Sequence, residues 1–428
     1  MRKGSLVLLG AAAGVALTLF AAQPEFALFA AQPGSVTAAE NYHRLDSFAD
    51  ALERVRRHYV EKPDDNALIM AAINGMLSEL EESSYVDPKH LNDTQPCTGL
   101  DCGNLGVDLT MEDGLVKIVS PLDDSPAAKA GLVAGDVVLR IDREGVQGLT
   151  FLDAVDKLRG RVNSAIQLTI VHPGQDQPSE LMMMRDLVRV RAVRFHSEGG
   201  DIGYIRVAQL NTQTTDLMKK AIASISMQIP SDRLKGYVLD LRNNPNGLLE
   251  EAVAFADAFL DKGEIVSIRA RKPEETRHFY ATAGDVTNGK PIIVLINGGS
   301  ASMAEVVAGA LQDNKRATIV GTHSFGKASA YTMIPLGPGR GAIRLATGHY
   351  VTPLGRVIQG RGISPDVEAP QDIPDELKPS KGRLRPGLQS YIPPDARNDK
   401  ALTTAYDLLR SASANAFSLR DSFRIDKR

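Results

Sequence analysis

The carboxyl-terminal half of the chain alternates short apolar runs with longer segments in which apolar residues recur at helical spacing. The runs have the length and β-branched content of buried strands, and they lie at residues 202–208, 236–242, 264–269, 291–296 and 317–321. Helical spacing covers residues 214–229, 248–260 and 304–311. Strands that alternate with helices predict a largely parallel sheet covered by helices, so we expect an α/β fold.

The amino-terminal region follows two other patterns. Residues 40–80 show amphipathic spacing that Pro63 interrupts, which predicts two helices. An apolar stretch at residues 6–22 follows two basic residues, the arrangement of a secretory signal. The stretch is also long enough to remain in a membrane, so a cleaved signal peptide and a membrane anchor both stay open for residues 1–39. Either predicts export to a periplasm or cell envelope.

Composition narrows the class of partner. The 428 residues allow two or three domains, and 49 basic residues are interspersed with 52 acidic ones. No basic block and no tryptophan are present. Because a nucleic-acid surface needs clustered positive charge and commonly aromatic stacking, we expect no nucleic-acid partner.

A serine follows the apolar run at residues 291–296. Asn297 and two glycines close the run as a turn, and helix-forming residues begin at Ala304. Ser302 is therefore expected at a strand-to-helix corner, where its hydroxyl is presented and the first amides of the helix can stabilise an oxyanion.

Two residues downstream of Ser302 could take its proton, His323 and Lys327. A lysine acts as a base only when neutral, so burial must lower its pKa from about 10.4. No Asp or Glu lies near Lys327 in the sequence, which favours this. A serine and a lysine in an Ala-rich segment are more often structural, however, so spacing alone leaves both interpretations open.

Four motifs in the carboxyl-terminal half follow one another in a characteristic order. They are D-L-R-N-N-P-N-G-L-L (240–249), N-G-G-S-A-S-M-A-E-V-V-A-G-A-L-Q-D (297–313), S-F-G-K (324–327) and Y-V-T-P-L-G-R-V-I-Q-G-R-G-I-S-P-D (350–366). Together they resemble the carboxyl-terminal processing, or tail-specific, protease family, peptidase family S41. The resemblance implies a crotonase-like serine protease core with Ser302 as nucleophile and Lys327 as base. It implies no cofactor, no metal and no catalytic role for His323.

Three positions depart from the family's pattern. Tyr331 stands where the family has the glutamine that accompanies the lysine, Asn246 replaces a glycine, and Met303 follows the nucleophile. The resemblance places the oxyanion hole at the amides of Met303 and of Asn246 or Gly247. Because of the three departures, a catalytically impaired relative that serves as a peptide-binding or scaffold protein is the alternative.

Residues 103–188 carry a second resemblance. The segments G-N-L-G-V-D-L, S-P-A-A-K-A-G-L-V-A-G-D-V-V-L-R-I-D and F-L-D-A-V-D-K-L-R-G resemble a PDZ domain. Its peptide-binding loop would be Gly103, Asn104, Leu105, Gly106 and Val107, whose amides would receive a partner's carboxylate while the partner adds a strand to the sheet. The plainer interpretation is that these glycines only permit tight turns.

The two cysteines, Cys97 and Cys102, lie in one short loop. In an oxidising compartment they can form a small disulfide worth roughly 2 kcal/mol, and free thiols are the alternative. Two thiols without a neighbouring histidine supply too few ligands for zinc.

The expected organisation has five parts. Residues 1–39 are a signal peptide or anchor, 40–95 an N-terminal helical segment, 96–188 an inserted PDZ domain, 195–370 the S41 core, and 371–428 a linker with a C-terminal helix. The expected partners are protein substrates with exposed apolar C-terminal tails. Membrane association through the N-terminal segment and a homo-oligomer are both compatible with the pattern.

Overall fold

The computed structural model describes the chain over residues 38–80, 83–88, 102–112, 114–173, 175, 177–373, 390–393 and 395–414. The chain divides into two compact units, Met1–Ala72 and Ile73–Arg428. Helices α2 (Ala38–His58) and α3 (Asp65–Ser78) flank Pro63, which confirms the predicted break. Across these described ranges, no helix is long and apolar enough to cross a membrane. The apolar stretch at 6–22 lies outside them, as does Cys97 and with it the predicted disulfide.

An antiparallel sheet forms the first part of the second unit. Its order is β3-β4-β5-β8-β9, with β6 paired to β5, and two helices pack against it. The elements are β3 (Val107–Glu112), β4 (Leu115–Pro121), α5 (Pro126–Lys129), β5 (Val137–Ile141), β6 (Glu144–Gly145), α6 (Phe151–Leu158), β8 (Ala165–Val171) and β9 (Ser179–Met184). Strand β3 lies at one edge, so its outer N–H and C=O groups face away from the sheet.

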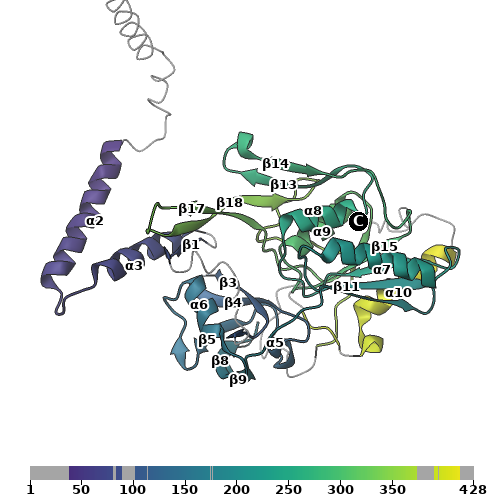
Figure 1. Cartoon of the computed structure of the whole chain (residues 1–428), viewed down its shortest axis with the longest axis horizontal. Coiled ribbons are helices and arrows are strands. Elements are labelled where there is room, and N and C mark those ends of the chain that lie inside the picture. Colours follow the sequence, from purple (N-terminus) through teal and green to yellow (C-terminus); the bar gives the residue numbers. More distant parts are fainter. Residues whose placement is uncertain are drawn as a thin grey trace, which may run out of the picture. The chain divides into compact units, whose positions relative to one another are not determined.

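A six-stranded sheet forms the centre of the second unit (Figure 1). Strands β10 and β11 pair antiparallel, and every other neighbouring pair is parallel. In spatial order the strands are β10 (Val193–Glu198), β11 (Ile202–Val207), β12 (Gly236–Asp240), β15 (Ile292–Ile296), β16 (Thr318–Gly321) and β19 (Val367–Glu368). This confirms the expected α/β fold.

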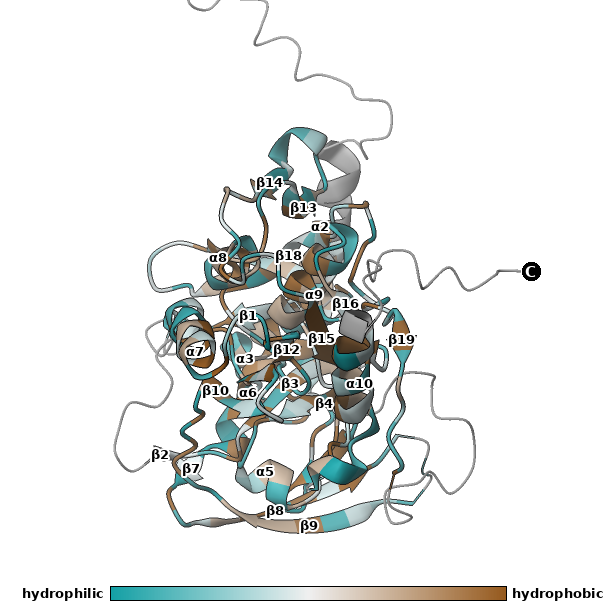
Figure 2. Cartoon of the chain, turned by 90° about the vertical axis from the view of Figure 1, so that its right-hand side faces the viewer, coloured by the Kyte–Doolittle hydropathy of each residue, from teal (hydrophilic) through white to brown (hydrophobic). Residues whose placement is uncertain are grey.

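Helices cover both faces of this sheet. On one face lie α7 (Thr214–Gln228), α8 (Leu249–Asp257) and α9 (Met303–Asp313), and on the other α10 (Lys400–Ala414). The side chains of β15 alternate between the two cores, and all five are buried. Its apolar run is therefore continuous, as Figure 2 shows by colour, because both of its faces pack against helices.

A second, antiparallel sheet has the order β1-β18-β13-β14, with β17 paired to β18. The strands are β1 (Ser84–Val86), β13 (Glu264–Ala270), β14 (Arg277–Tyr280), β17 (Ser329–Pro335) and β18 (Ala342–Val351). We expected residues 264–269 in the parallel sheet, and this was wrong. The apolar run showed that β13 is buried, but its partner β18 lies about eighty residues further along the chain, which the run does not indicate.

Candidate active site

Ser302 lies at the corner between β15 and α9, as the sequence predicts. Its backbone has φ 55° and ψ −115°, an uncommon conformation for a residue with a side chain. Its amide donates to the Glu305 carboxylate at 2.9 Å, and the hydroxyl-bearing residue is half-buried. A strained serine at the end of a buried parallel strand is the arrangement of a nucleophile elbow.

The turn before Ser302 is fixed by a buried asparagine. Asn297 accepts hydrogen bonds from the amides of Asn243, at 2.9 Å, and Gly299, at 3.0 Å. Its side-chain amide donates to the Asn243 side chain and to the Ser390 carbonyl. A Cβ atom at Gly299 would lie 2.3 Å from the Asn243 Oδ1 atom, so a side chain there would displace the Asn243 amide that bonds Asn297. These bonds join the loop after β12 to the corner after β15.

Glu305 links Ser302 to the loop that carries Lys327. This fully buried carboxylate accepts hydrogen bonds from the Ser324 hydroxyl, from the Gly326 amide at 2.7 Å and from the Lys327 amide at 3.0 Å, as well as from the Ser302 amide. Burial raises the pKa of Glu305 to about 7, while these hydrogen bonds act in the opposite direction. Glu305 was not among the site residues expected from the sequence. The S-x-x-E spacing from Ser302, which is typical of a helix-capping pair, was the available signal.

The Lys327 side chain is turned toward the sheet that resembles a PDZ domain. Its Nζ atom donates to the Leu109 carbonyl oxygen at 3.0 Å and lies 3.4 Å from the Asp108 carboxylate. Among the described residues, no hydrogen bond joins Lys327 to Ser302. The expectation that no carboxylate is near Lys327 is therefore wrong. Asp108 is remote in sequence and lies on β3, which the loop before β17 approaches in the folded chain.

The predicted oxyanion residues lie against one another. Gly247 follows β12 and pairs with Leu210, and a Cβ atom on it would lie 3.2 Å from the Met303 Cβ atom. Asn246 precedes Gly247 in this loop. Within the described part of the chain, neither the Gly247 nor the Met303 amide donates a hydrogen bond. Two unused amides thus lie next to the serine corner.

Tyr331 does not share a regular strand with Lys327. Strand β17 begins at Ser329, and its pairing with β18 shifts register between Ala330 and Tyr331. The alternation that would align the two side chains is therefore broken. The Arg344 guanidinium lies over the Tyr331 ring, 3.5 Å from its centroid. The Nδ1 atom of His323 lies 2.9 Å from the Ser324 carbonyl oxygen.

A buried ionic network braces the loop that leads to Gly247. Arg242 bonds the Asp240 carboxylate with two of its nitrogens and reaches Asp399 with a third, at 2.9 Å. Arg206 donates to the Asp240 carbonyl and holds Asp123 with two hydrogen bonds of 2.9 and 2.7 Å. Burial alone would raise the pKa of Asp240, but the guanidinium groups of Arg242 and Arg206 hold it well below its usual range. The network is structural, because each charge has its partner.

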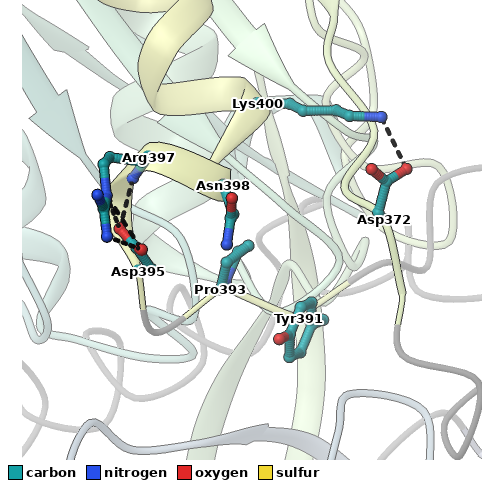
Figure 3. A pocket seen from close by; sticks show the side chains of 7 residues that line it. All are labelled: Asp372, Tyr391, Pro393, Asp395, Arg397, Asn398 and Lys400. Carbon is teal, nitrogen blue, oxygen red and sulfur yellow. Dashed lines mark hydrogen bonds and ion pairs between the residues drawn. The ribbon is translucent and has the colours of Figure 1, made fainter.

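Two cavities adjoin the carboxyl-terminal segment. One of about 730 Å³ is lined by residues of this network and by Ser390, whose hydroxyl accepts from the Ala134 amide at 2.9 Å. The other, of about 560 Å³, is shown in Figure 3. Its charged side chains pair with each other, Arg397 with Asp395 and Lys400 with Asp372.

The predicted peptide-binding loop leads into β3. Gly106 has φ 66°, and a Cβ atom on it would lie 2.4 Å from the Ser125 Cβ atom, so glycine is required. Its amide donates to the Asn104 side chain at 2.8 Å. Asn104 also pairs with Asp186 through the backbone. The Asn104 side chain and the backbone pairing of Asn104 with Asp186 therefore fix the conformation of this loop.

Two family models match separate parts of the chain. Residues 201–369 match the model of peptidase family S41, and residues 103–182 match that of the PDZ domain. A carboxy-terminal-processing protease of Bartonella bacilliformis is 48% identical over 393 residues, which are 88% of this chain and 90% of that protein. The carboxy-terminal processing protease CtpA of Bacillus subtilis is 29% identical over 375 residues, 87% of this chain and 78% of that one.

A solved structure has the same fold. The photosystem II D1 C-terminal processing protease superposes with a TM-score of 0.64 at 29% identity, covering 75% of this chain and 92% of that one.

Proposed function

This chain belongs to peptidase family S41 and is a serine-type carboxy-terminal-processing protease with a PDZ domain, and we propose that Ser302 and Lys327 form its catalytic dyad. The observation that carries the proposal is the Glu305 carboxylate. It accepts hydrogen bonds from the amides of both residues and so fixes their backbones near each other.

The proposed reaction is acyl transfer. The Ser302 hydroxyl attacks the scissile carbonyl while the neutral Lys327 amine takes its proton. The amides of Met303 and Gly247, with Asn246 shaping the loop, donate to the oxyanion, each worth about 3 kcal/mol. The resulting ammonium returns the proton to the leaving amine, and a water molecule then releases the acyl group from Ser302. We propose that Tyr331 affects this site through the Arg344 guanidinium that lies over its ring.

The Lys327 amine must leave β3 before this chemistry can begin. Leu109 belongs to the edge strand on which a PDZ domain takes up a peptide by strand addition. A tail on β3, with its carboxylate at the Gly103–Val107 loop, would compete with Lys327 for that edge. We therefore propose that occupation of the PDZ domain releases the base.

We further propose apolar protein tails as the substrates and the periplasm or cell envelope as the location. The composition of residues 6–22 supports export, with membrane association if the stretch is retained. On α2, Leu45, Phe48 and Val55 are exposed, which supports a homo-oligomer.

Cleavage of an unfolded protein with an apolar tail tests the dyad. We expect Ser302→Ala and Lys327→Ala each to lower kcat roughly 10³-fold or more, with the double variant no worse than either. Cleavage retained by Ser302→Ala, with contaminating proteases excluded, contradicts the dyad. Tail binding by the wild type without any cleavage would instead support a peptide-binding protein on an impaired core.

A further inference from the structure

The loop that carries Lys327 lies against a second loop, residues 358–363. The Ser324 amide donates to the Ile363 carbonyl oxygen at 3.1 Å. The Ile363 amide in turn donates to the Ser324 hydroxyl at 2.6 Å. The two loops are therefore joined three residues before the proposed base.

Further along, the backbones of the two loops approach too closely for side chains. The Gly360 amide donates to the Gly326 carbonyl oxygen at 2.8 Å. A Cβ atom on Gly326, which has φ 87°, would lie 3.0 Å from the Gly362 nitrogen, and one on Gly362 would lie 2.7 Å from the Ser324 carbonyl oxygen. Glycine at both positions thus permits the contact that brings residues 358–363 beside Lys327.

Gln359 reaches from this second loop to the residue that follows Lys327. Its side-chain oxygen accepts a hydrogen bond from the Ala328 amide. Within the part of the chain that the structure describes, the Gln359 side chain makes no other hydrogen bond, and the residue is half-buried. The head group therefore has one polar partner there, and a substitution that removes the oxygen acts on that contact.

The backbone of Lys327 is held on both sides of its Cα atom. Its own amide donates to Glu305 at 3.0 Å, and the next amide along the chain, that of Ala328, donates to Gln359. Because each peptide unit is planar, these two hydrogen bonds set the orientations of the planes that flank the Cα atom. Those orientations determine the direction in which the Lys327 side chain leaves the backbone.

We propose that Gln359 is a positioning residue for the base, and that it directs Lys327 toward Ser302 by holding the Ala328 amide. The inference rests on the proposed dyad, since Gln359 acts only through Lys327. The Lys327 amine donates to Leu109 in this structure, so the side chain must swing before it can take the Ser302 proton. A fixed backbone makes that movement end at a defined place, and a misplacement of about 1 Å can cost roughly 100-fold in rate.

Replacing the Gln359 head group tests the contact. For Gln359→Leu, which has no acceptor, we expect kcat on one tailed peptide to fall about 10- to 100-fold while KM stays within about 2-fold. Gln359→Glu keeps an acceptor and should stay within about 3-fold of the wild type. Because its charge favours the ammonium form of Lys327, this variant is measured at about pH 9. Gln228→Leu is the matched control, since that amide also bonds one neighbour, Ser224, on the surface of α7.

A double variant distinguishes positioning of the base from general support of the site. In Lys327→Ala there is no amine to direct, so adding Gln359→Leu should leave the residual rate unchanged. A further fall of about 10-fold would overturn the inference. Thermal melting shows whether each protein is folded at the assay temperature. If Gln359→Leu is not, Gln359→Met, which keeps the length of the side chain, takes its place.

The outcomes separate this inference from the proposed function. A wild-type kcat in Gln359→Leu, with Ser302→Ala and Lys327→Ala still impaired, overturns the role of Gln359 and leaves the dyad intact. A loss in Gln359→Glu as large as that in Gln359→Leu also overturns it, because the acceptor is then not what matters. Cleavage retained by Ser302→Ala contradicts the dyad, and this inference with it.

Discussion

The Lys327 Nζ atom donates a hydrogen bond to the Leu109 carbonyl oxygen at 3.0 Å. Leu109 belongs to strand β3 of the PDZ domain, and Lys327 lies in the loop just before β17 in the protease core. The bond places the proposed base on the strand edge where a substrate tail would pair, with Asp108 as a second partner. The proposed tail recognition and the proposed base would therefore share one contact.

Asp108→Asn should raise the basal activity. The substitution removes the carboxylate near the Lys327 amine, so less free energy opposes the release of that amine. The attraction within such a partly buried pair is worth about 1 kcal/mol. Its loss should raise the rate of hydrolysis of a peptide too short to occupy the PDZ domain by roughly 5-fold. Glu112→Gln is the control, because Glu112 lies on the same strand and pairs with Lys117. A basal rate that is unchanged or lower in Asp108→Asn would show that Asp108 does not restrain the base.

The pH dependence of stability should report the buried Glu305. Because burial raises its pKa to about 7 from an ordinary 4.5, the native state holds a proton that the unfolded chain releases. The stabilisation is complete below about pH 4.5 and is lost as the pH rises through about 7. The free energy of unfolding should fall by about 3 kcal/mol over this window.

Denaturant unfolding of the wild type and Glu305→Gln, followed by circular dichroism at several pH values, measures this contribution. Glutamine cannot ionise, so in the variant the free energy of unfolding should lack this fall between about pH 4.5 and 7. This holds even if the variant is less stable at every pH. An identical slope in both proteins would assign the pH dependence to other groups.

The strands of the parallel sheet were predictable because each one is marked by the residues of its own segment. The run at residues 291–296 is apolar at every position, since β15 packs on both faces, and Asn297 with two glycines marks its end. The position of Ser302 followed directly. The contact of Lys327 with Asp108 and Leu109 was not predictable. No periodicity in the sequence around Lys327 or in β3 specifies that these two segments approach each other. The same holds for β13, whose run shows burial but not its pairing with β18.

Gly247→Ala should lower turnover more than stability. An added Cβ atom would lie 2.5 Å from the Leu210 Cβ atom and 2.8 Å from the Leu210 carbonyl oxygen, so the loop must move. Displacement of one oxyanion donor costs about 3 kcal/mol, roughly 10²-fold in kcat. Gly145→Ala is the matched control, since nothing lies within 4 Å of its added Cβ atom. Steady-state kinetics should show the loss in kcat, and a fall confined to KM would remove Gly247 from the oxyanion hole.

Tyr331 provides the last prediction. The resemblance to the family, which has glutamine at this position, predicts that glutamine holds Lys327 better than tyrosine does. Tyr331→Gln would then raise turnover, and Tyr331→Phe would lower it. The structure adds a different contact, the Arg344 guanidinium 3.5 Å above the ring, and breaks the strand alternation between Tyr331 and Lys327.

Phenylalanine keeps a ring face for Arg344, whereas glutamine removes it, and such a stack is worth about 0.5–2 kcal/mol. We therefore now expect Tyr331→Phe to match the wild type and Tyr331→Gln to lose roughly 2- to 30-fold in turnover. Single-turnover cleavage of one tailed substrate at matched stability distinguishes the two accounts. If Phe is slow and Gln is fast, the hydroxyl serves the lysine and the stack on Arg344 is incidental. If Phe alone retains the wild-type rate, Tyr331 acts through Arg344.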